Sequence, residues 1–308
     1  MKKFVLKLIL FSGLILGSLV LLNFLYVRTE AYRTMNDMEK FYNVPDNLEI
    51  VNFGSSHGLY AFDYSELSLK GFNFALNSQD LFYDFQLLKQ YRNHMVPGTT
   101  IVLISVSFFS LSTDPTDAEL MKRDQRYYRL LDIGLIEGST PMNLLRFKLL
   151  PVLSAGSTLI RIFQDKPADT FLELNTNRFD SGELEVEAKE TAVRHLSYIE
   201  TNGFDRGISL LKEIIVFCQQ LELKPVLVTT PFTEYYTKYF SKNILDEFHR
   251  VVYSIANEFS IPYFDYSRDP YFWKSPELFI DDDHLNSIGR TIFTNMVIDT
   301  IEKTGIFR

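Results

Sequence analysis

The chain is short of cysteine and of positive charge, and each shortage argues against a class of protein. Cys218 is the only cysteine among 308 residues, so no disulfide can form within the chain. It falls on the apolar side of a predicted helix, which is typical of a small core residue. Exported domains of oxidising compartments usually carry disulfides, so this shortage favours the outer face of a cell with a single membrane. The net charge of −8 argues against nucleic acid as a partner.

One long hydrophobic run lies at the N-terminus. Leu8 to Val27 is twenty residues with Asn23 as the strongly polar member, which makes about 30 Å of helix, enough to cross a bilayer. Three lysines lie on its N-terminal side: Lys2, Lys3 and Lys7. This charge bias predicts a cytoplasmic N-terminus and an extracellular remainder. A cleaved signal peptide is the alternative, but the run is long for one, so we expect a single-pass cell-membrane anchor over residues 1–28.

Beyond the anchor, short apolar runs alternate with helical patterns. Five runs are predicted as strands: 48–53, 71–76, 99–106, 225–231 and 261–264. Strands that alternate with helices predict an α/β fold with three layers, in which helices cover both faces of a parallel sheet of about five strands, as in flavodoxin-like folds. The 27 Phe and 17 Tyr residues provide ample side chains for a hydrophobic core.

The same patterns predict the domain organisation. Residues 29–47 are polar and mixed, as expected for a stalk, and residues 48–308 form the predicted catalytic domain. Within it, the segment at about 111–202 breaks the alternation and is predicted as a helical insertion. It could cover the carboxyl edge of the sheet as a lid or acceptor platform, or it could be additional helical packing.

A serine-containing turn follows the first predicted strand. Glycine at Gly54 permits a sharp turn, and Ser56 opens the next helix at the carboxyl end of the strand, where parallel sheets place their sites. The positive end of that helix would favour an oxyanion. Gly54 to Gly58 also matches the Gly-x-Ser-x-Gly turn of α/β-hydrolases, but that fold has several strands before its nucleophile and here there is one. A serine that only caps a helix is the remaining alternative.

The run Asp281-Asp282-Asp283-His284 provides a second candidate for chemistry near the C-terminus. In an Asp-x-x-His loop, Asp281 can bond one imidazole nitrogen of His284 and leave the other nitrogen to accept the proton of a serine. Three aspartates beside a histidine could instead bind a hard metal ion or simply be solvated. A metal site is the weaker hypothesis, because one histidine with adjacent carboxylates lacks the usual spread of ligands.

The other histidines give weaker signals. His94 and His249 lie in helical patterns and are expected to be surface or packing residues. His57 follows the serine and could line the pocket, but its neighbours in the sequence offer no obvious carboxylate to orient it.

Together these motifs resemble the SGNH/GDSL superfamily of serine esterases and acyltransferases. Phe53 to Ser56 is similar to its first block, which implies that Ser56 is the nucleophile. Asp281-x-x-His284 is similar to its last block, which implies that both residues are catalytic. Asn73 to Ser78 is similar to the second block, and this implies an oxyanion hole formed by backbone N–H groups of Ser56 and Ser78. The Gly-x-Asn of the third block is absent after the strand at 99–106, so Asn77 or a backbone group could replace its asparagine.

Within that superfamily, the chain resembles the membrane-tethered branch that acts on cell-surface polysaccharides or teichoic acids, of which the D-alanyl-lipoteichoic acid transfer protein is one relative. The resemblance implies transfer of an acyl group, expected to be acetyl, from a multi-spanning membrane O-acyltransferase to hydroxyls of an exported glycan, without a cofactor. Four alternatives stay open: an esterase, D-alanyl transfer to teichoic acid, a non-catalytic scaffold for glycan assembly, and a metal-dependent phosphoesterase.

Overall fold

The computed structural model describes residues 1–112, 124–164 and 181–306. The chain forms two compact units, Met1–Asn43 with Met121–Glu173, and Val44–Leu120 with Leu174–Arg308. We call them the anchor unit and the sheet unit. The segment predicted as an insertion is therefore divided, because residues 121–173 belong to the anchor unit while α8 (Ser181–Asn202) belongs to the sheet unit.

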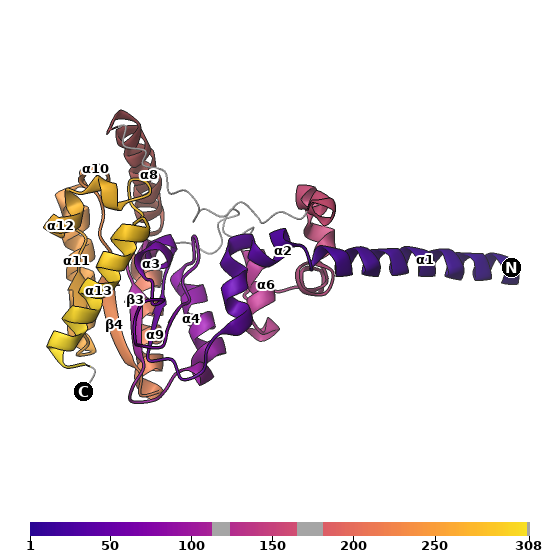
Figure 1. Ribbon diagram of the computed structural model, residues 1–308, viewed down its shortest axis with the longest axis horizontal. Helices are drawn as coiled ribbons and strands as arrows, with labels where there is room; N and C mark the ends of the chain where they lie inside the picture. The colour runs from indigo at the N-terminus through magenta and orange to yellow at the C-terminus, as the bar shows by residue number, and fades with distance from the viewer. Residues whose placement is uncertain (113–123, 165–180, 307–308) are drawn as a thin grey trace. The chain divides into compact units, whose positions relative to one another are not determined.

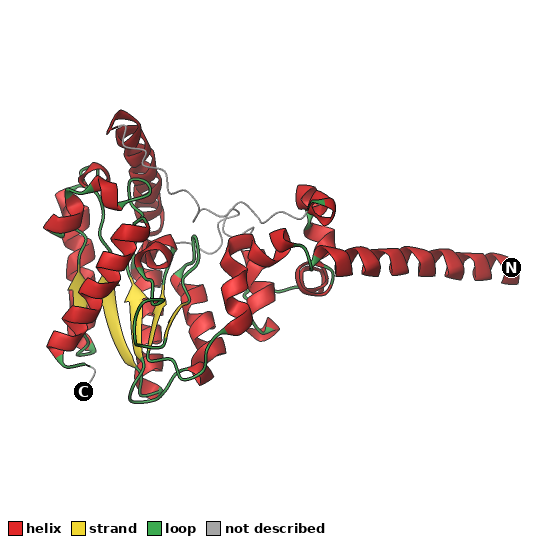
Figure 2. Ribbon diagram, viewed as in Figure 1, coloured by secondary structure: helices red, strands yellow, loops and turns green. Residues whose placement is uncertain are grey.

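The sheet unit contains five parallel strands, seen as arrows in Figures 1 and 2, in the order β2-β1-β3-β4-β5. Their bounds are β1 Ile50–Phe53, β2 Gly71–Asn73, β3 Ile101–Ser105, β4 Lys224–Thr229 and β5 Tyr263–Asp265. This confirms the predicted fold class. The order reverses direction between β1 and β3, and the crevice at such a reversal is where open parallel sheets bind ligands. The turn that carries Ser56 follows β1, so it lies at this position.

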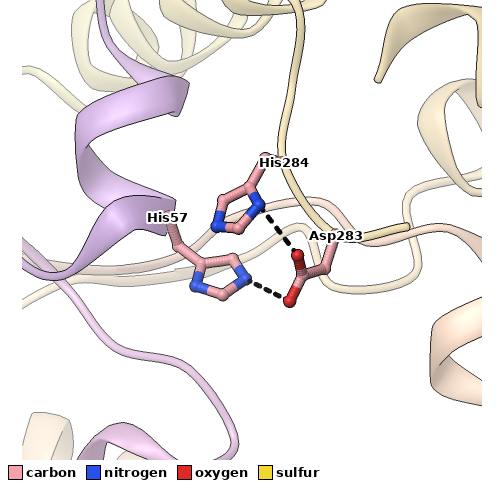
Figure 3. A group of neighbouring side chains, drawn as sticks. All are labelled: His57, Asp283 and His284. Atoms are coloured by element: carbon pink, nitrogen blue, oxygen red, sulfur yellow. Dashed lines mark ion pairs between the residues drawn. The ribbon is translucent and has the colours of Figure 1, made fainter. Parts of the chain in front are cut away.

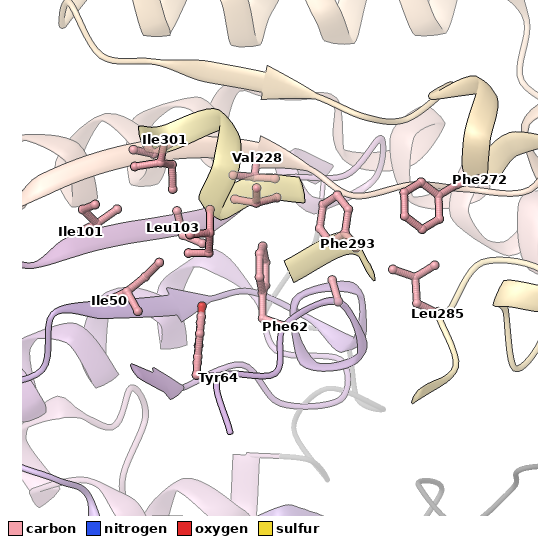
Figure 4. Packing of buried hydrophobic residues seen from close by; sticks show 14 of the residues in the cluster. Ile50, Phe62, Tyr64, Ile101, Leu103, Val228, Phe272, Leu285, Phe293 and Ile301 are labelled. Atoms are coloured by element: carbon pink, nitrogen blue, oxygen red, sulfur yellow. The ribbon is translucent and has the colours of Figure 1, made fainter. Parts of the chain in front are cut away.

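One face of the sheet carries a continuous hydrophobic core (Figure 4). Side chains from β1, β3 and β4 pack there against α13 (Ser287–Thr304) and the end of α3 (Ser56–Ala61). Phe293 of α13 is fully buried, and its ring lies 5.5 Å from that of Phe62 and 5.8 Å from that of Phe272. Burial of such a ring contributes on the order of 2 kcal/mol or more, so this core fixes α13 on the sheet.

The other side chains of the strands, which alternate in direction, are also buried: Val51, Val102, Ile104 and Leu227. Here α9 (Asp205–Gln220) packs against β4 and against α4 (Leu81–Tyr91). Cys218 of α9 is fully buried, as expected for a core residue. The sheet unit is completed by α10 (Glu234–Thr237), α11 (Lys242–Glu258) and α12 (Pro270–Trp273).

The regular secondary structure among the described residues of the anchor unit is helical, and its first helix is α1 (Lys2–Tyr26). This is one helix long and apolar enough to cross a membrane, with a mean hydropathy of 2.5. The residues predicted as a stalk form α2 (Glu30–Thr34) and η1 (Met35–Asn43). The remaining elements are short: η4 Asp124–Arg126, α6 Tyr127–Leu130, η5 Ile133–Leu135, α7 Pro141–Leu144, η6 Leu145–Leu149, η7 Pro151–Ser154 and η8 Gly156–Phe163.

Candidate active site

The turn after β1 presents Ser56 at the carboxyl edge of the sheet. Gly54 has φ = 142°, a conformation that side chains rarely adopt, and a Cβ on it would lie 2.7 Å from Cβ of Ser105. Glycine is therefore required here by both the backbone angle and the close approach of β3. Ser56 then begins α3 and remains partly exposed, while its neighbours Ser55 and His57 are buried. Ser56 is thus the accessible hydroxyl of the turn.

A buried carboxyl group supports this turn from behind. Asp84 of α4 accepts a hydrogen bond from Nε2 of Gln79 at 2.7 Å and another from the backbone N–H of Gly54. Burial raises the pKa of Asp84 to about 8, although both hydrogen bonds act in the opposite direction. The sequence pattern did not indicate this role for Asp84, because the residue lies in an ordinary helical segment.

The loop before α13 is built around the side chain of Asp281. Its Oδ1 accepts the backbone N–H groups of Asp283 and His284 at 3.1 and 2.8 Å, which closes a tight local turn. Its Oδ2 lies 2.8 Å from Nδ1 of His284. The aspartate therefore both shapes the loop and orients the imidazole, as the sequence predicts for an Asp-x-x-His pair.

The structure brings Ser56 and His284 together across 228 residues of sequence, with 2.7 Å between Oγ and Nε2. Contacts of α13 with α3 and with the residues just after α3 hold this geometry. Thr294 of α13 donates to the carbonyl of Ala61 at 3.2 Å, and Arg290 forms an ion pair with Asp63 at 3.0 Å. The serine hydroxyl, the imidazole and the Asp281 carboxylate thus form a continuous hydrogen-bonded chain.

Asp283 and His57 extend this chain, and sequence reasoning did not assign them. The Asp283 carboxylate lies between two imidazoles, 2.9 Å from Nδ1 of His284 and 3.2 Å from Nε2 of His57 (Figure 3). The sequence neighbours of His57 offer no such carboxylate; its partner comes from the distant loop, and only the fold places it there. The feature of the sequence that could have indicated Asp283 is the run of three aspartates before His284.

The two imidazoles differ in their electrostatics. Burial disfavours the charged form of His284, but the carboxylates of Asp281 and Asp283 outweigh it and raise its pKa well above the usual 6.5. For His57, burial dominates and lowers the pKa in spite of Asp283. The pKa of Asp283 is held well below its ordinary value, because its attraction to both imidazoles overcomes the effect of burial. A positive charge in this cluster therefore resides on His284.

A third histidine lies behind His57. His195 of α8 stacks on the ring of Phe109 with 3.8 Å between centroids, and its Nδ1 lies 2.7 Å from the hydroxyl of Tyr236. Burial lowers the pKa of His195 to about 3, so the ring is neutral in the folded protein. In the same helix, Thr191 donates to Asp282 at 3.4 Å. Helix α8 therefore supports the loop 281–284.

Asp282 differs from the two aspartates beside it. It is buried, and burial together with the charges of Asp283 and Asp281 raises its pKa to about 9. Its backbone carbonyl accepts the hydroxyl of Thr233 at 2.5 Å, and neither imidazole is among its hydrogen-bond partners in the described structure. Asp282 is therefore a structural member of the loop.

Two groups of side chains have the composition of a metal site. They are His57 with Asp283 and His284, and Asp281 with Asp282 and Asp283, each with potential ligand atoms within 4.8 Å of one another. The same atoms already bond one another, since Asp281 accepts two backbone N–H groups and an imidazole, and Asp283 faces two imidazoles. A bound cation would have to displace these internal contacts, so the donor set fits a proton-transfer cluster better than a metal site.

Two of the three residues expected to form an oxyanion hole, Asn77 and Ser78, lie in the loop between β2 and α4, while the third, Ser56, begins α3. Ser78 has the left-handed φ of 53°, and both Asn77 and Ser78 are half-buried. The loop is joined to the turn that carries Ser56, because the N–H of Leu76 donates to the carbonyl of Gly54 at 3.3 Å. Where the third block would follow β3, the side chain of Ser105 packs against Gly54 and Gly58.

The remaining histidines lie in other side-chain environments. His94 pairs with Asp46 at 3.0 Å, and His249 pairs with Asp265 at 3.0 Å. Neither pair includes a residue of the Ser56 cluster.

Comparison with known proteins gives little beyond the fold. No protein-family model matches the chain, and no curated protein matches its sequence. Among solved structures, the chain is similar to a protein from Bacteroides fragilis NCTC 9343 described as a proposed acylhydrolase. The two are 12% identical with a TM-score of 0.42, over 86% of this chain and 94% of the other. A likeness at this level assigns neither a family nor an activity, so any functional conclusion depends on the geometry of the site.

Proposed function

We propose that this protein transfers acyl groups through a serine nucleophile, with Ser56, His284 and Asp281 as the catalytic residues. The observation that carries the proposal is the 2.7 Å separation of Ser56 Oγ and His284 Nε2, with Asp281 at 2.8 Å from the other imidazole nitrogen. A nucleophile, a base and an orienting carboxylate in hydrogen-bond sequence are what this chemistry requires.

The reaction has two balanced steps. Ser56 Oγ attacks the carbonyl carbon of an ester donor while Nε2 of His284 takes its proton, and the same proton then goes to the departing alkoxide. A hydroxyl acceptor next gives its proton to His284 and attacks the acyl-serine, which releases the acylated acceptor and restores the Ser56 hydroxyl. In this proposal the N–H groups of Ser56 and Ser78, with Asn77 beside them, stabilise the oxyanion.

The acceptor class follows from the resemblance to membrane-tethered SGNH proteins and from α1. A helix that can cross a membrane and three lysines before it support a catalytic domain outside the cell. We therefore assign hydroxyls of an exported polysaccharide as acceptors, acetyl as the acyl group, and a multi-spanning membrane O-acyltransferase as the donor. With water as the acceptor, the same two steps would make the protein an esterase.

A fluorophosphonate probe tests the nucleophile directly, because it reacts with activated serines. We expect the wild-type protein to be labelled, Ser56→Ala to lose labelling, and Ser55→Ala to retain it. Ser55 is a matched control because it precedes Ser56 in the same turn and its hydroxyl lies 3.4 Å from His57 rather than at His284. Labelling of Ser56→Ala, or no labelling of a folded wild-type protein, would contradict the proposal; the second result would favour a non-catalytic scaffold.

Partition of the acyl group separates transfer from hydrolysis. The wild-type protein is given a chromogenic acetyl ester, with and without a soluble oligosaccharide, and acetylated sugar and free acetate are measured. If the protein is a transferase, the yield of acetylated sugar should rise, and that of free acetate should fall, as the oligosaccharide concentration increases. Acetate alone, at every sugar concentration, would assign esterase activity to the same residues.

A further inference from the structure

The segment 138–164 of the anchor unit has an unusual composition for this chain. Although the whole protein carries a net charge of −8, this segment contains no aspartate or glutamate and three basic residues: Arg146, Lys148 and Arg161. It also exposes several large apolar side chains, namely Met142, Leu149, Leu153, Ile160 and Phe163, of which Phe163 is 83% exposed. A basic segment with exposed apolar side chains is typical of elements that lie in a membrane interface.

Hydrogen bonds tie this segment to the last turns of α1. The side chain of Asn23 donates to the carbonyl of Leu149 at 3.4 Å and accepts the N–H of Val152 at 3.1 Å. The hydroxyl of Tyr26 lies 2.9 Å from that of Thr158. The strongly polar residue of the apolar run therefore has its partners in the segment, which places η7 and η8 beside the end of the helix.

This attachment fixes the depth of the segment. Asn23 lies three residues before the end of α1, or about 4.5 Å along the axis at 1.5 Å per residue. With α1 across a bilayer, chain that is bonded to Asn23 lies at the level of the last helical turn, where acyl chains meet headgroups. A polar group without a hydrogen-bond partner at that level costs free energy. The hydrogen bonds of Asn23 give partners to its own amide and to backbone groups of Leu149 and Val152. Two residues after the end of α1, Arg28 extends back over the ring of Phe24, 3.5 Å from its centroid, as interfacial arginines do.

We infer that residues 142–163 lie in the outer interface of the lipid bilayer, with their apolar side chains among the acyl chains and their basic side chains near lipid phosphates. The exposed side chains of Ile160 and Phe163 stand three residues apart in a 3₁₀-helix, so they share one face of η8. The absence of carboxylates favours an anionic lipid such as phosphatidylglycerol. The anchor unit would then bind the membrane in two ways, through the spanning helix α1 and through residues 142–163 at the bilayer surface.

Site-specific fluorescence in lipid nanodiscs tests this placement with the full-length protein. Cys218 is fully buried, so single cysteines at exposed positions can be labelled selectively with an environment-sensitive dye. We would compare Ile160→Cys and Phe163→Cys in discs that contain phosphatidylglycerol, with a shallow nitroxide lipid, a deep nitroxide lipid and aqueous iodide as quenchers. The expected result at these two positions is strong quenching by the shallow lipid, weak quenching by iodide and a blue-shifted emission.

Two further positions complete the experiment. Val193→Cys of α8 is the matched aqueous control, since Val193 and Ile160 have similar exposed fractions of 56% and 57%. Leu14→Cys lies in the middle of α1 and reports whether the helix is in the bilayer. Iodide quenching at residues 160 and 163, with lipid quenching at residue 14, would overturn the inference and indicate a surface for a protein partner. Iodide quenching at residue 14 would also overturn it, because α1 would not be in the bilayer. Neither outcome depends on the activity of Ser56.

Discussion

The imidazole rings of His57 and His284 lie stacked with 4.8 Å between centroids and 29° between planes, and both face the carboxylate of Asp283. Two cations this close would repel each other strongly. The opposite pKa shifts remove this conflict, because burial keeps His57 neutral while Asp281 and Asp283 favour the charged form of His284. Asp283 thus joins a neutral histidine, His57, to the proposed base, His284.

Two carboxylates face the same nitrogen of His284, so they are expected to substitute for one another. At alkaline pH, where His284 is neutral in every variant, Asp281→Asn and Asp283→Asn should each slow fluorophosphonate labelling by about tenfold, equivalent to about 1.4 kcal/mol. The double variant should lose more than the product of the two single effects, because Nδ1 then has no carboxylate partner. The labelling rates of the wild type, the two single variants and the double variant give the coupling free energy between Asp281 and Asp283.

Asp282→Asn is the control for that series, since the contact of its side chain is with Thr191 rather than with an imidazole. Its labelling rate should stay near that of the wild type. Strictly multiplicative effects of the Asp281 and Asp283 variants would contradict the shared role.

The labelling rate should depend on pH through His284. The base acts only when it is neutral, and its pKa is raised well above 6.5, so the rate should rise on the alkaline side of neutrality. Removal of a negative charge in Asp283→Asn lowers that pKa, so the rising limb should move to lower pH. The measurement is the first-order labelling rate across the pH range in which the protein stays folded. An unchanged or alkaline-shifted limb in Asp283→Asn would show that Asp283 does not act on His284.

The turn that carries Ser56 should not tolerate a side chain at residue 54. Gly54→Ala combines an unfavourable positive φ with a contact to Cβ of Ser105, so we expect a loss of labelling and of on the order of 2 kcal/mol or more of stability. Ser105→Gly removes the contact but not the backbone strain. In the Gly54→Ala background, Ser105→Gly should restore part of the free energy of unfolding, measured with urea. If the effects of the two substitutions on this free energy are fully additive, a clash between residue 54 and Ser105 is excluded.

His195 should make the folded protein sensitive to acid. An unfolded histidine has a pKa near 6.5 and the folded value is about 3, so between these values the unfolded chain binds the extra proton. Stability should therefore fall as pH decreases from about 6.5 towards 3, by up to about 1.4 kcal/mol per pH unit from this group. His195→Gln, which can still accept the Tyr236 hydroxyl, should show a shallower decrease in the free energy of unfolding. Equal slopes for the two proteins would show that another group causes the acid sensitivity.

The sequence predicted much of the fold because its signals are local. Short apolar runs separated by helical patterns identified the five strands, and a glycine followed by serines marked the turn after β1. Ser56 could be predicted as the exposed hydroxyl because it is the first residue of the helix, and the start of a helix is set by adjacent residues. Gln79, Asp84 and His195 gave no such signal, because their roles arise from contacts between elements.

Three features can be identified in the amino-acid sequence, because each depends on the chemistry of neighbouring residues: a serine turn, an Asp-x-x-His loop and an apolar N-terminal helix. The fold is needed to bring Ser56 and His284 within 2.7 Å of each other, and to place Asp283 between His284 and His57. Packing of α13 on the sheet and on α3 sets those distances. No local pattern encodes them, because they arise from burial of side chains that are more than two hundred residues apart in the chain.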